Sequence, residues 1–256
     1  MDRKALLGSL LMNGIVQSKG FRARRDAARR RLDAINPHLT PGGDPADPSR
    51  IGWFRHVYEA AAGDTANVPW ARLAASPLLK DWIDLAGDLR GLRALDVGCG
   101  LGDNAEILAK AGAEVTAFDY VPRAIEWARE RFPQSRVDYR AADLFRPPGE
   151  WGHAFNLVHE SATLQTLPPE RLPEAARRLA SFLAPGGQLL VIASARDAGE
   201  PQTTPWLPLT RADIEALAVD GLRLERLELH RSENPSVGRH WRACLLGPAE
   251  RKAASP

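Results

Sequence analysis

Residues 94–105 read Ala-Leu-Asp-Val-Gly-Cys-Gly-Leu-Gly-Asp-Asn-Ala. The apolar run before Gly98 is typical of a buried strand, and the residues after Gly102 are typical of a helix start, where Asp103 and Glu106 have the spacing of a capping box. Three glycines at alternate positions join the two patterns. Because glycine lets the backbone turn tightly and approach a ligand closely, this loop indicates a ligand site at the start of a helix.

Short apolar runs and helical patterns alternate along the chain from residue 92 onward. We expect strands at 92–97, 114–118, 136–140, 155–159 and 188–194, and helices near 104–111, 122–132, 172–183 and 210–218. Two further strand patterns, 222–229 and 240–246, follow with no long helical pattern between them. This order predicts an α/β fold with a doubly wound, seven-stranded, mostly parallel sheet and an antiparallel terminal hairpin at one edge.

The penultimate strand pattern contains a break in its alternation. Leu222 and Leu224 are in phase with each other, as are Leu227 and Leu229, but the two pairs are offset by one residue. Period-2 alternation cannot absorb this offset without an extra residue, so we expect a bulge near residues 225–226.

An acid follows the glycine loop at the distance that nucleoside binding requires. Asp119 lies 21 residues after Gly98, at the end of the second expected strand. There its carboxylate can accept hydrogen bonds from both ribose hydroxyls. A dinucleotide loop has the pattern G-x-G-x-x-G, but the third position after Gly100 is Asp103, whose charge would repel a pyrophosphate. A ligand with a positive centre and no phosphate, such as S-adenosylmethionine, fits this acid better.

Over residues 92–194 the chain resembles the class I S-adenosylmethionine-dependent methyltransferases. Five motifs occur in the family's order, at residues 94–105, 119, 142–144, 155–158 and 183–187, although Asn156 stands where the family usually has Asp. The resemblance implies a Rossmann-like methyltransferase fold and S-adenosyl-L-methionine as the cofactor. It also implies the cofactor-binding residues Asp96, Gly98, Gly100, Gly102, Asp119, Tyr120, Asp143 and Leu144.

The candidate catalytic residues are His159 and Glu160, at the end of the fourth expected strand. Methyl transfer is an in-line displacement at an activated sulfonium, so the protein mainly has to align the nucleophile and exclude water. His159 titrates near neutrality and could take a proton from a thiol, hydroxyl or amine; alternatively, it holds Glu160 or a backbone carbonyl in place. Glu160 could instead face the cofactor ammonium or a cationic substrate.

Aromatic residues before the core are candidates for substrate binding. Trp53, Tyr58 and Trp70, together with Phe54, could roof a pocket and contact the sulfonium by cation–π attraction. The alternative is that these rings only pack a helix onto the edge of the sheet.

A long loop after the fifth expected strand, residues 195–210, supplies the further candidates Arg196 and Trp206. This loop and residues 164–169 are loosely similar to the thiol and thiopurine S-methyltransferase branch, which slightly favours a thiol acceptor. An oxygen or nitrogen nucleophile remains an alternative, as does a cofactor-binding protein without turnover. A nicotinamide oxidoreductase is disfavoured by Asp103.

Few residues could form a metal or nucleic-acid site. A catechol-type metal site needs several carboxylates after the fourth and fifth strands, where only Glu160 and Asp197 are available, so we expect no metal. The net charge is only +2 and no basic, aromatic-interleaved groove is evident, so we expect a small-molecule acceptor and no nucleic acid. The oligomeric state stays open.

The 256 residues allow one large domain with an extension, or two smaller domains. We expect a helical N-terminal extension and lid at 1–90, a methyltransferase core at 91–248 and a tail at 249–256. The segment 51–74 is expected to close over the cofactor and acceptor. The basic segment 19–31 has three open interpretations: a solvated helix face, a surface for an anionic partner, or a transit peptide.

Composition bounds the environment. Hydrophobic residues make up 44% and charged residues 26%, which excludes a disordered chain. Two cysteines, Cys99 and Cys244, cannot form a disulfide framework or a cysteine zinc site, and they favour a reducing compartment, the cytoplasm. No apolar run approaches about 18 residues, so we expect no transmembrane helix and no membrane partner.

Overall fold

The computed structural model describes residues 19–33, 51–200, 207–231 and 238–249. The chain divides into two compact units, residues 1–75 and 76–256. The helix α4 (Pro77–Ala86) belongs to the larger unit, whereas the sequence analysis grouped it with the N-terminal extension.

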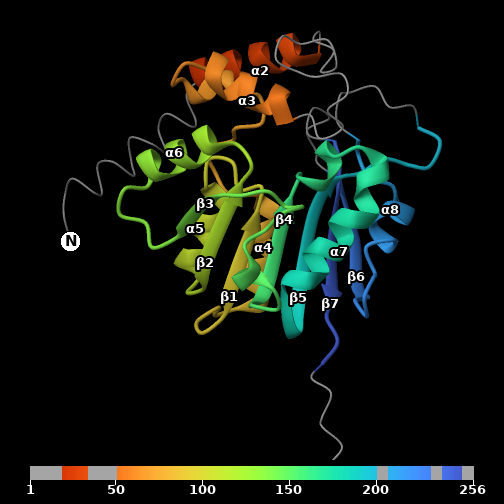
Figure 1. Cartoon of the computed structure of the whole chain (residues 1–256). Coiled ribbons are helices and arrows are strands. Elements are labelled where there is room, and N and C mark those ends of the chain that lie inside the picture. Colours follow the sequence, from red (N-terminus) through yellow and green to blue (C-terminus); the bar gives the residue numbers. More distant parts are fainter. Residues whose placement is uncertain (1–18, 34–50, 201–206, 232–237, 250–256) are drawn as a thin grey trace, which may run out of the picture. The chain divides into compact units, whose positions relative to one another are not determined.

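The larger unit is built on one seven-stranded sheet with the strand order β3-β2-β1-β4-β5-β7-β6 (Figure 1). The pairings among the first five strands are parallel, and β7 lies antiparallel between β5 and β6. This arrangement confirms the predicted doubly wound sheet and its antiparallel terminal hairpin. The strands are β1 (Arg93–Val97), β2 (Glu114–Asp119), β3 (Asp138–Ala141), β4 (Phe155–Ser161), β5 (Leu183–Ser194), β6 (Arg223–Arg231) and β7 (Arg239–Leu246).

Helices cover both faces of the sheet, as the alternating sequence pattern predicts. On one face, Phe182 and Ile214 bring α7 and α8 into a hydrophobic cluster with the strands, and on the other face Leu79, Leu108 and Ile125 do the same for α4, α5 and α6 (Figure 1). In the described ranges, no helix has both the length and the apolar character needed to cross a bilayer. The remaining helical elements of this unit are α5 (Asp103–Lys110), α6 (Pro122–Arg131), η2 (Gly149–Trp151), η3 (Leu164–Thr166), η4 (Pro169–Arg171), α7 (Leu172–Phe182) and α8 (Arg211–Glu215).

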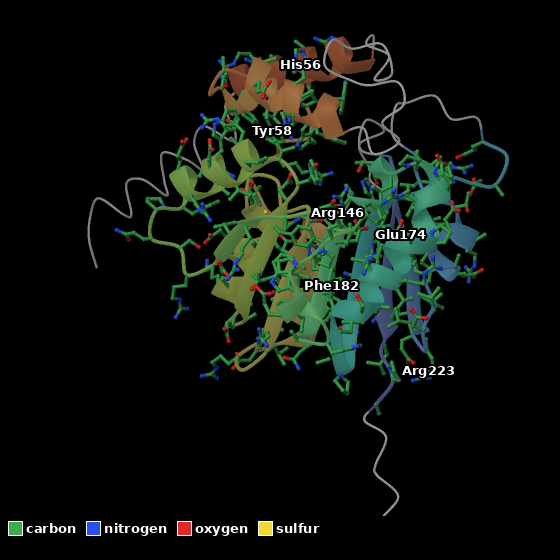
Figure 2. All side chains as sticks on the ribbon, in the orientation of Figure 1. His56, Tyr58, Arg146, Glu174, Phe182 and Arg223 are labelled. Atoms are coloured by element: carbon green, nitrogen blue, oxygen red, sulfur yellow. The ribbon has the colours of Figure 1, made fainter. Side chains whose placement is uncertain are left out.

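Trp151 anchors the connection between β3 and β4. Its ring lies 5.0 Å from that of Phe118 and 6.2 Å from that of Phe182, which Figure 2 labels at the end of α7. All three side chains are nearly fully buried. A connection that has little regular structure is therefore held to the core by one aromatic group.

The strand boundaries lie within two residues of those expected, except at the start of β5. β3 begins at Asp138, slightly later than expected. β5 begins at Leu183 rather than Gln188, because Leu183 already pairs with Phe155 on β4 before the turn that follows. The register between β4 and β5 then shifts between Phe155 and Leu157, and this irregularity accommodates the turn.

The terminal hairpin contains the predicted bulge. The pairing of β6 with β7 shifts register between Leu224 and Arg226, so the extra residue falls where the alternation breaks. Arg242 on β7 is 5% exposed; its guanidinium donates to Glu228 on β6 and to the carbonyl oxygen of Leu78 in α4. The hairpin is thus tied both within itself and to a helix.

The capping box expected at the start of α5 is absent, and a capping box is present at the start of α8. At the start of α8, Thr210 and Asp213 cap each other reciprocally. At the start of α5, the N-cap is Gly102, in the left-handed region with φ 87°, and it has no side chain to cap with. The prediction for Asp103 and Glu106 is therefore wrong: Asp103 pairs with Arg131, as described below, and Glu106 accepts from the hydroxyl of Tyr139 at 2.7 Å.

The smaller unit contains α2 (Lys19–Asp33), α3 (Ile51–Ala60) and η1 (Thr65–Asn67). Arg24 of α2 forms an ion pair of 3.4 Å with Asp64, the N-cap of η1. The indole N–H of Trp70 donates to the hydroxyl of Tyr58 at 3.0 Å, and the ring of Trp70 lies 5.9 Å from that of Trp53. The candidate aromatic residues therefore do cluster, as expected.

Candidate functional site

The loops that follow the parallel strands meet at the carboxyl edge of the sheet, next to the boundary between β1 and β4. The strand order reverses at this boundary, and such switch points are where open α/β sheets bind ligands. Backbone bonds join the loops: Cys99 donates to the carbonyl of Phe118 at 2.9 Å, and Ala142 donates to that of Asp119 at 3.1 Å. The ends of β1, β2 and β3 thus form one continuous rim.

Asp119 lies at the centre of this rim. One carboxylate oxygen accepts from the backbone N–H of Gly100 at 3.0 Å, and the other accepts from that of Val121 at 2.9 Å. Burial raises the pKa of Asp119 to about 6, the charge of Asp96 adds to the rise, and the backbone N–H donors oppose it. Each carboxylate oxygen has a second lone pair, so Asp119 can still accept from two hydroxyls of a ligand.

Two glycines of the loop are required by the protein's own packing. Gly98 has φ 65° and Gly102 has φ 87°, a region that other residues rarely adopt. A Cβ at Gly98 would overlap the hydroxyl of Thr163, and a Cβ at Gly102 would overlap the hydroxyl of Tyr139. Close approach to a ligand is the reason that the sequence suggests for these glycines, whereas contacts within the protein already require glycine at positions 98 and 102.

Asp103 does not have the environment expected from the sequence. Its two carboxylate oxygens accept from the guanidinium of Arg131 at 2.8 and 2.9 Å, and the same guanidinium donates to the carbonyl of Leu101. The side chains are only 18% and 9% exposed. The argument that an unneutralised Asp103 repels phosphate is therefore wrong, because Arg131 of α6 balances the charge and clamps the loop.

The other predicted cofactor residues line the same rim. Tyr120 follows β2 and is 38% exposed. Asp143 follows β3 and accepts from the backbone N–H of Phe145 at 2.8 Å, which closes a local turn. The side chain of Leu144 is buried in the core, so a ligand at this position would meet its backbone. The structure thus brings together the predicted residues that follow β1, β2 and β3.

His159 is fully buried and paired with Asp96. Its Nδ1 lies 2.7 Å from a carboxylate oxygen of Asp96, its partner in register on the adjacent strand β1. The side chains are 0% and 2% exposed. The geometry matches the positioning role considered as an alternative for His159, with Asp96 as the partner rather than Glu160; its role as a base stays a prediction.

Glu160 follows His159 on β4, and its side chain points to the other face of the sheet, because successive side chains of a strand alternate between the two faces. One of its carboxylate oxygens accepts from the backbone N–H groups of Thr163 at 2.9 Å and Leu164 at 3.1 Å. Burial raises the pKa of Glu160 to about 7, against the opposing effect of these N–H groups. Glu160 therefore anchors the turn after β4, and its catalytic role stays a prediction.

Gln165, which the sequence analysis missed, joins the loops after β4 and β5. The side-chain oxygen of Gln165 accepts from the backbone N–H of Ser194 at 2.7 Å, and its backbone carbonyl accepts from the backbone N–H of Leu207 at 2.7 Å. Arg196 donates from Nε to the carbonyl of Pro208 at 2.8 Å, which closes the base of the loop predicted to bind substrate. Gln165 is buried, and no pattern in the sequence marks this role. Trp206 lies outside the described residues.

The remaining predicted substrate residues belong to the smaller unit. Trp53 and Tyr58 are 1% and 2% exposed, and Trp70 contacts both rings. Their role toward an acceptor stays a prediction. Across the described ranges, no three or more His, Cys, Asp and Glu side chains are grouped so that they could hold a metal ion.

Comparisons with known proteins agree with this geometry. Residues 94–187 match the family model described as a methyltransferase domain. The chain is 36% identical over 153 residues to the ubiquinone biosynthesis O-methyltransferase of Aromatoleum aromaticum, covering 59% of this chain and 63% of the relative. It is 36% identical over 117 residues to the enzyme of the same name from Bordetella avium, covering 44% and 48%. The chain thus spans less than two thirds of the length of these relatives.

Two solved structures share the fold. The N-methyltransferase NodS of Bradyrhizobium japonicum, in complex with S-adenosyl-L-homocysteine, is 22% identical, with a TM-score of 0.61 over 79% of this chain and 100% of that chain. The 1,6-didemethyltoxoflavin-N1-methyltransferase of Burkholderia thailandensis is 16% identical, with a TM-score of 0.62 over 82% and 92%. Motifs, sheet order and family match agree: the chain contains a class I S-adenosylmethionine-dependent methyltransferase domain.

Proposed function

We propose that this protein transfers a methyl group from S-adenosylmethionine to a small molecule, with an oxygen nucleophile first and nitrogen second. The observation that carries the proposal is Asp119, a partly buried carboxylate at the end of β2 that accepts from the backbone N–H of Gly100, in the loop after β1 beside the switch point of the sheet. The curated relatives named above are O-methyltransferases, which favours oxygen over the thiol that the sequence suggested.

The residues of the rim fit this cofactor. Asp119 would hold the ribose hydroxyls, Asp143 and the backbone of Leu144 would hold the adenine, and Asp96 would face the amino-acid portion. Asp96 and Asp119 make the rim acidic, whereas Arg131 is committed to Asp103 and Arg146 lies 3.8 Å from Asp143. An acidic rim suits a ligand that carries a sulfonium and an ammonium and no phosphate.

The chain's contribution to the reaction is mainly alignment. The bound cofactor supplies an activated methyl group, so little covalent chemistry is left to the protein. The loops after β4 and β5, joined by Gln165, would hold the acceptor in line and exclude water. If the acceptor must lose a proton, His159 is the sequence-predicted base, with release to water as the alternative route.

The smaller unit is proposed to act as a lid, and its helix α3 (Ile51–Ala60) carries Trp53 and Tyr58 of the aromatic cluster. Hydrogen exchange of the amides in α3, measured with and without S-adenosylhomocysteine and acceptor, tests this role. Protection that increases with both ligands supports the lid, and protection that ignores them makes the unit a packing element only. The cytoplasmic location and the absence of metal, nucleic-acid and membrane partners stay predictions.

The experiment that tests the function combines binding with turnover. Calorimetry with S-adenosylhomocysteine and with NAD⁺ should show binding of the first and not of the second. Panels of phenols, amines and thiols with S-adenosylmethionine should give S-adenosylhomocysteine fastest with a phenol or another hydroxyl. Fastest turnover with thiols would restore the sulfur acceptor, binding without any turnover would favour a non-catalytic protein, and no binding would overturn the proposal.

A further inference from the structure

The pair formed by Asp96 and His159 is buried directly beneath the glycine loop. The two residues are in register on adjacent parallel strands, so their side chains share one face of the sheet, and Asp96 lies two residues before Gly98. Because an ionised carboxylate only accepts hydrogen bonds, the Nδ1 of His159 is the donor in their 2.7 Å contact. This bond fixes the orientation of the Asp96 carboxylate from one side.

The other side of the pair lacks a protein partner. Within the part of the chain that the structure describes, neither the second carboxylate oxygen of Asp96 (Oδ2) nor Nε2 of His159 has a hydrogen-bond partner. Buried polar atoms are rarely left without one, because the loss of water is then uncompensated. An unpartnered, fully buried carboxylate oxygen at the base of a ligand loop points to a donor that arrives with the ligand.

The charges around the pair restrict the chemistry of that donor. The charge of Asp96 raises the pKa of both Asp119 and the Cys99 thiol, so Asp96 lies close enough to both to influence them. Two carboxylates beside one loop favour a cation that can donate N–H bonds over a neutral hydroxyl. The amino-acid portion of S-adenosylmethionine carries such a group, its ammonium.

We propose that His159 is a positioning residue, whose Nδ1–H holds Asp96 so that Oδ2 of Asp96 receives the ammonium group of the cofactor. This inference rests on the proposed function, and it assigns His159 to cofactor recognition rather than to proton transfer from the acceptor. It also explains why a histidine without any exposed surface lies at this point in a strand.

Two ligands separate this role from a purely structural one. S-adenosylhomocysteine carries the ammonium group, and 5′-methylthioadenosine has the same nucleoside and sulfur but lacks the amino-acid end. His159→Leu should weaken binding of the first by about ten-fold and of the second by less than about two-fold, since a charge-assisted bond is lost only where the ammonium is present. His159→Asn keeps an N–H at the position of Nδ1 and should restore most of the difference.

Leu157→Ala is the matched control, because Leu157 lies on the same face of β4 and is buried. It should lower stability and leave the ratio of the two affinities unchanged. If His159→Leu does not fold, the wild-type protein still gives an answer: the Nδ1 proton resonance, identified by its absence in His159→Asn, should shift with S-adenosylhomocysteine and remain nearly unmoved by methylthioadenosine.

The outcomes separate the two proposals. Binding of neither ligand by the wild-type protein overturns the proposed function. Binding of both, with a ratio that His159→Leu leaves unchanged or with a proton resonance that shifts equally for both, overturns the role of His159 and leaves the function standing.

Discussion

The two halves of the sheet, divided between β1 and β4, hold their loops in different ways. In the half with β1, β2 and β3, the loops bond mainly to one another, as where Asp119 accepts from Gly100. In the half with β4 and β5, buried polar side chains hold the loops: Glu160 accepts from Thr163 and Leu164, and Gln165 accepts from Ser194. Under the proposed function, the first half would hold the cofactor, and the second would let the acceptor loops differ while two side chains hold their bases.

The halves meet where Gly98 touches Thr163, and this contact should be the most sensitive point. Gly98→Ala should lower the free energy of unfolding by about 3–4 kcal/mol, through a strained φ and a forced overlap with the threonine hydroxyl. Urea unfolding of this variant, of Thr163→Ala and of the double variant measures the coupling. Relief of about 1–2 kcal/mol in the double variant is expected.

Gly149→Ala is the control for that series, since nothing lies within 4 Å of an added Cβ there and its φ is not positive. It should change stability by less than about 0.5 kcal/mol. Strictly additive effects of Gly98→Ala and Thr163→Ala would mean that the two halves are not coupled at this contact.

The next largest effect on stability is expected from the ion pair of Arg131 with Asp103, which holds the loop after β1. Arg131→Met leaves the mostly buried Asp103 without its partner and should cost about 2–3 kcal/mol in unfolding free energy. Arg140→Met, which breaks only exposed pairs, should cost less than about 0.5 kcal/mol. Thermal unfolding compares them; an equal effect of both variants would show that the clamp adds nothing beyond a surface ion pair.

Loss of the central acid should act on the ligand more than on the fold. Asp119→Ala should weaken S-adenosylhomocysteine by roughly 10- to 100-fold, because one charged acceptor that serves hydroxyls is worth about 1.5–3 kcal/mol. Asp138→Ala, an exposed acid on the neighbouring strand β3, should bind like the wild type. Calorimetry measures both, and an unchanged affinity in Asp119→Ala would remove the ribose assignment.

The smallest expected effect is a pH-dependent change in the free energy of unfolding, caused by Glu160 in the half of the sheet with β4 and β5. Burial raises the pKa of Glu160 from 4.5 to about 7, so between these pH values the folded protein holds a proton that the unfolded chain has released. The contribution of Glu160 to the free energy of unfolding therefore falls as the pH rises through that window. Glu160→Gln stays neutral and should be the more stable protein at pH 8, by about 1–2 kcal/mol.

That difference should vanish near pH 4.5, where the wild-type carboxyl is protonated as well. Urea unfolding from pH 4.5 to 8.5 measures it, with the exposed Glu150→Gln as the control. A Glu160→Gln variant that is less stable than the wild type at pH 8 would show that the charge on Glu160 is needed by the turn after β4.

Sequence reasoning succeeded where the signal is local. The strand, the glycines and the helix start of residues 94–105 are contiguous, and Asp119 follows at a spacing that the fold fixes. The sheet topology followed from the alternation of strand and helix patterns, and even the bulge in β6 was visible as a change of phase.

Prediction from the sequence failed where the partner of a side chain lies far along the chain. The charge on Asp103 was interpreted in isolation, whereas Arg131, 28 residues later, neutralises it. Likewise, Gln165 finds its partner 29 residues away at Ser194, and no periodicity marks a residue whose role is to bond a backbone N–H of another loop. Such pairs become visible only when the topology is known.

Arg242 has a consequence for how the larger unit is made on the ribosome. β7 lies between β5 and β6 in the sheet, yet it is synthesised after both. Until β7 emerges, the long apolar strand β5 presents an open hydrogen-bonding edge, and such edges pair with other chains. Arg242 arrives with β7 and joins Leu78 near the start of the unit to Glu228 near its end, so these ties and the pairing of β5 on this side form only after the last strand has been synthesised.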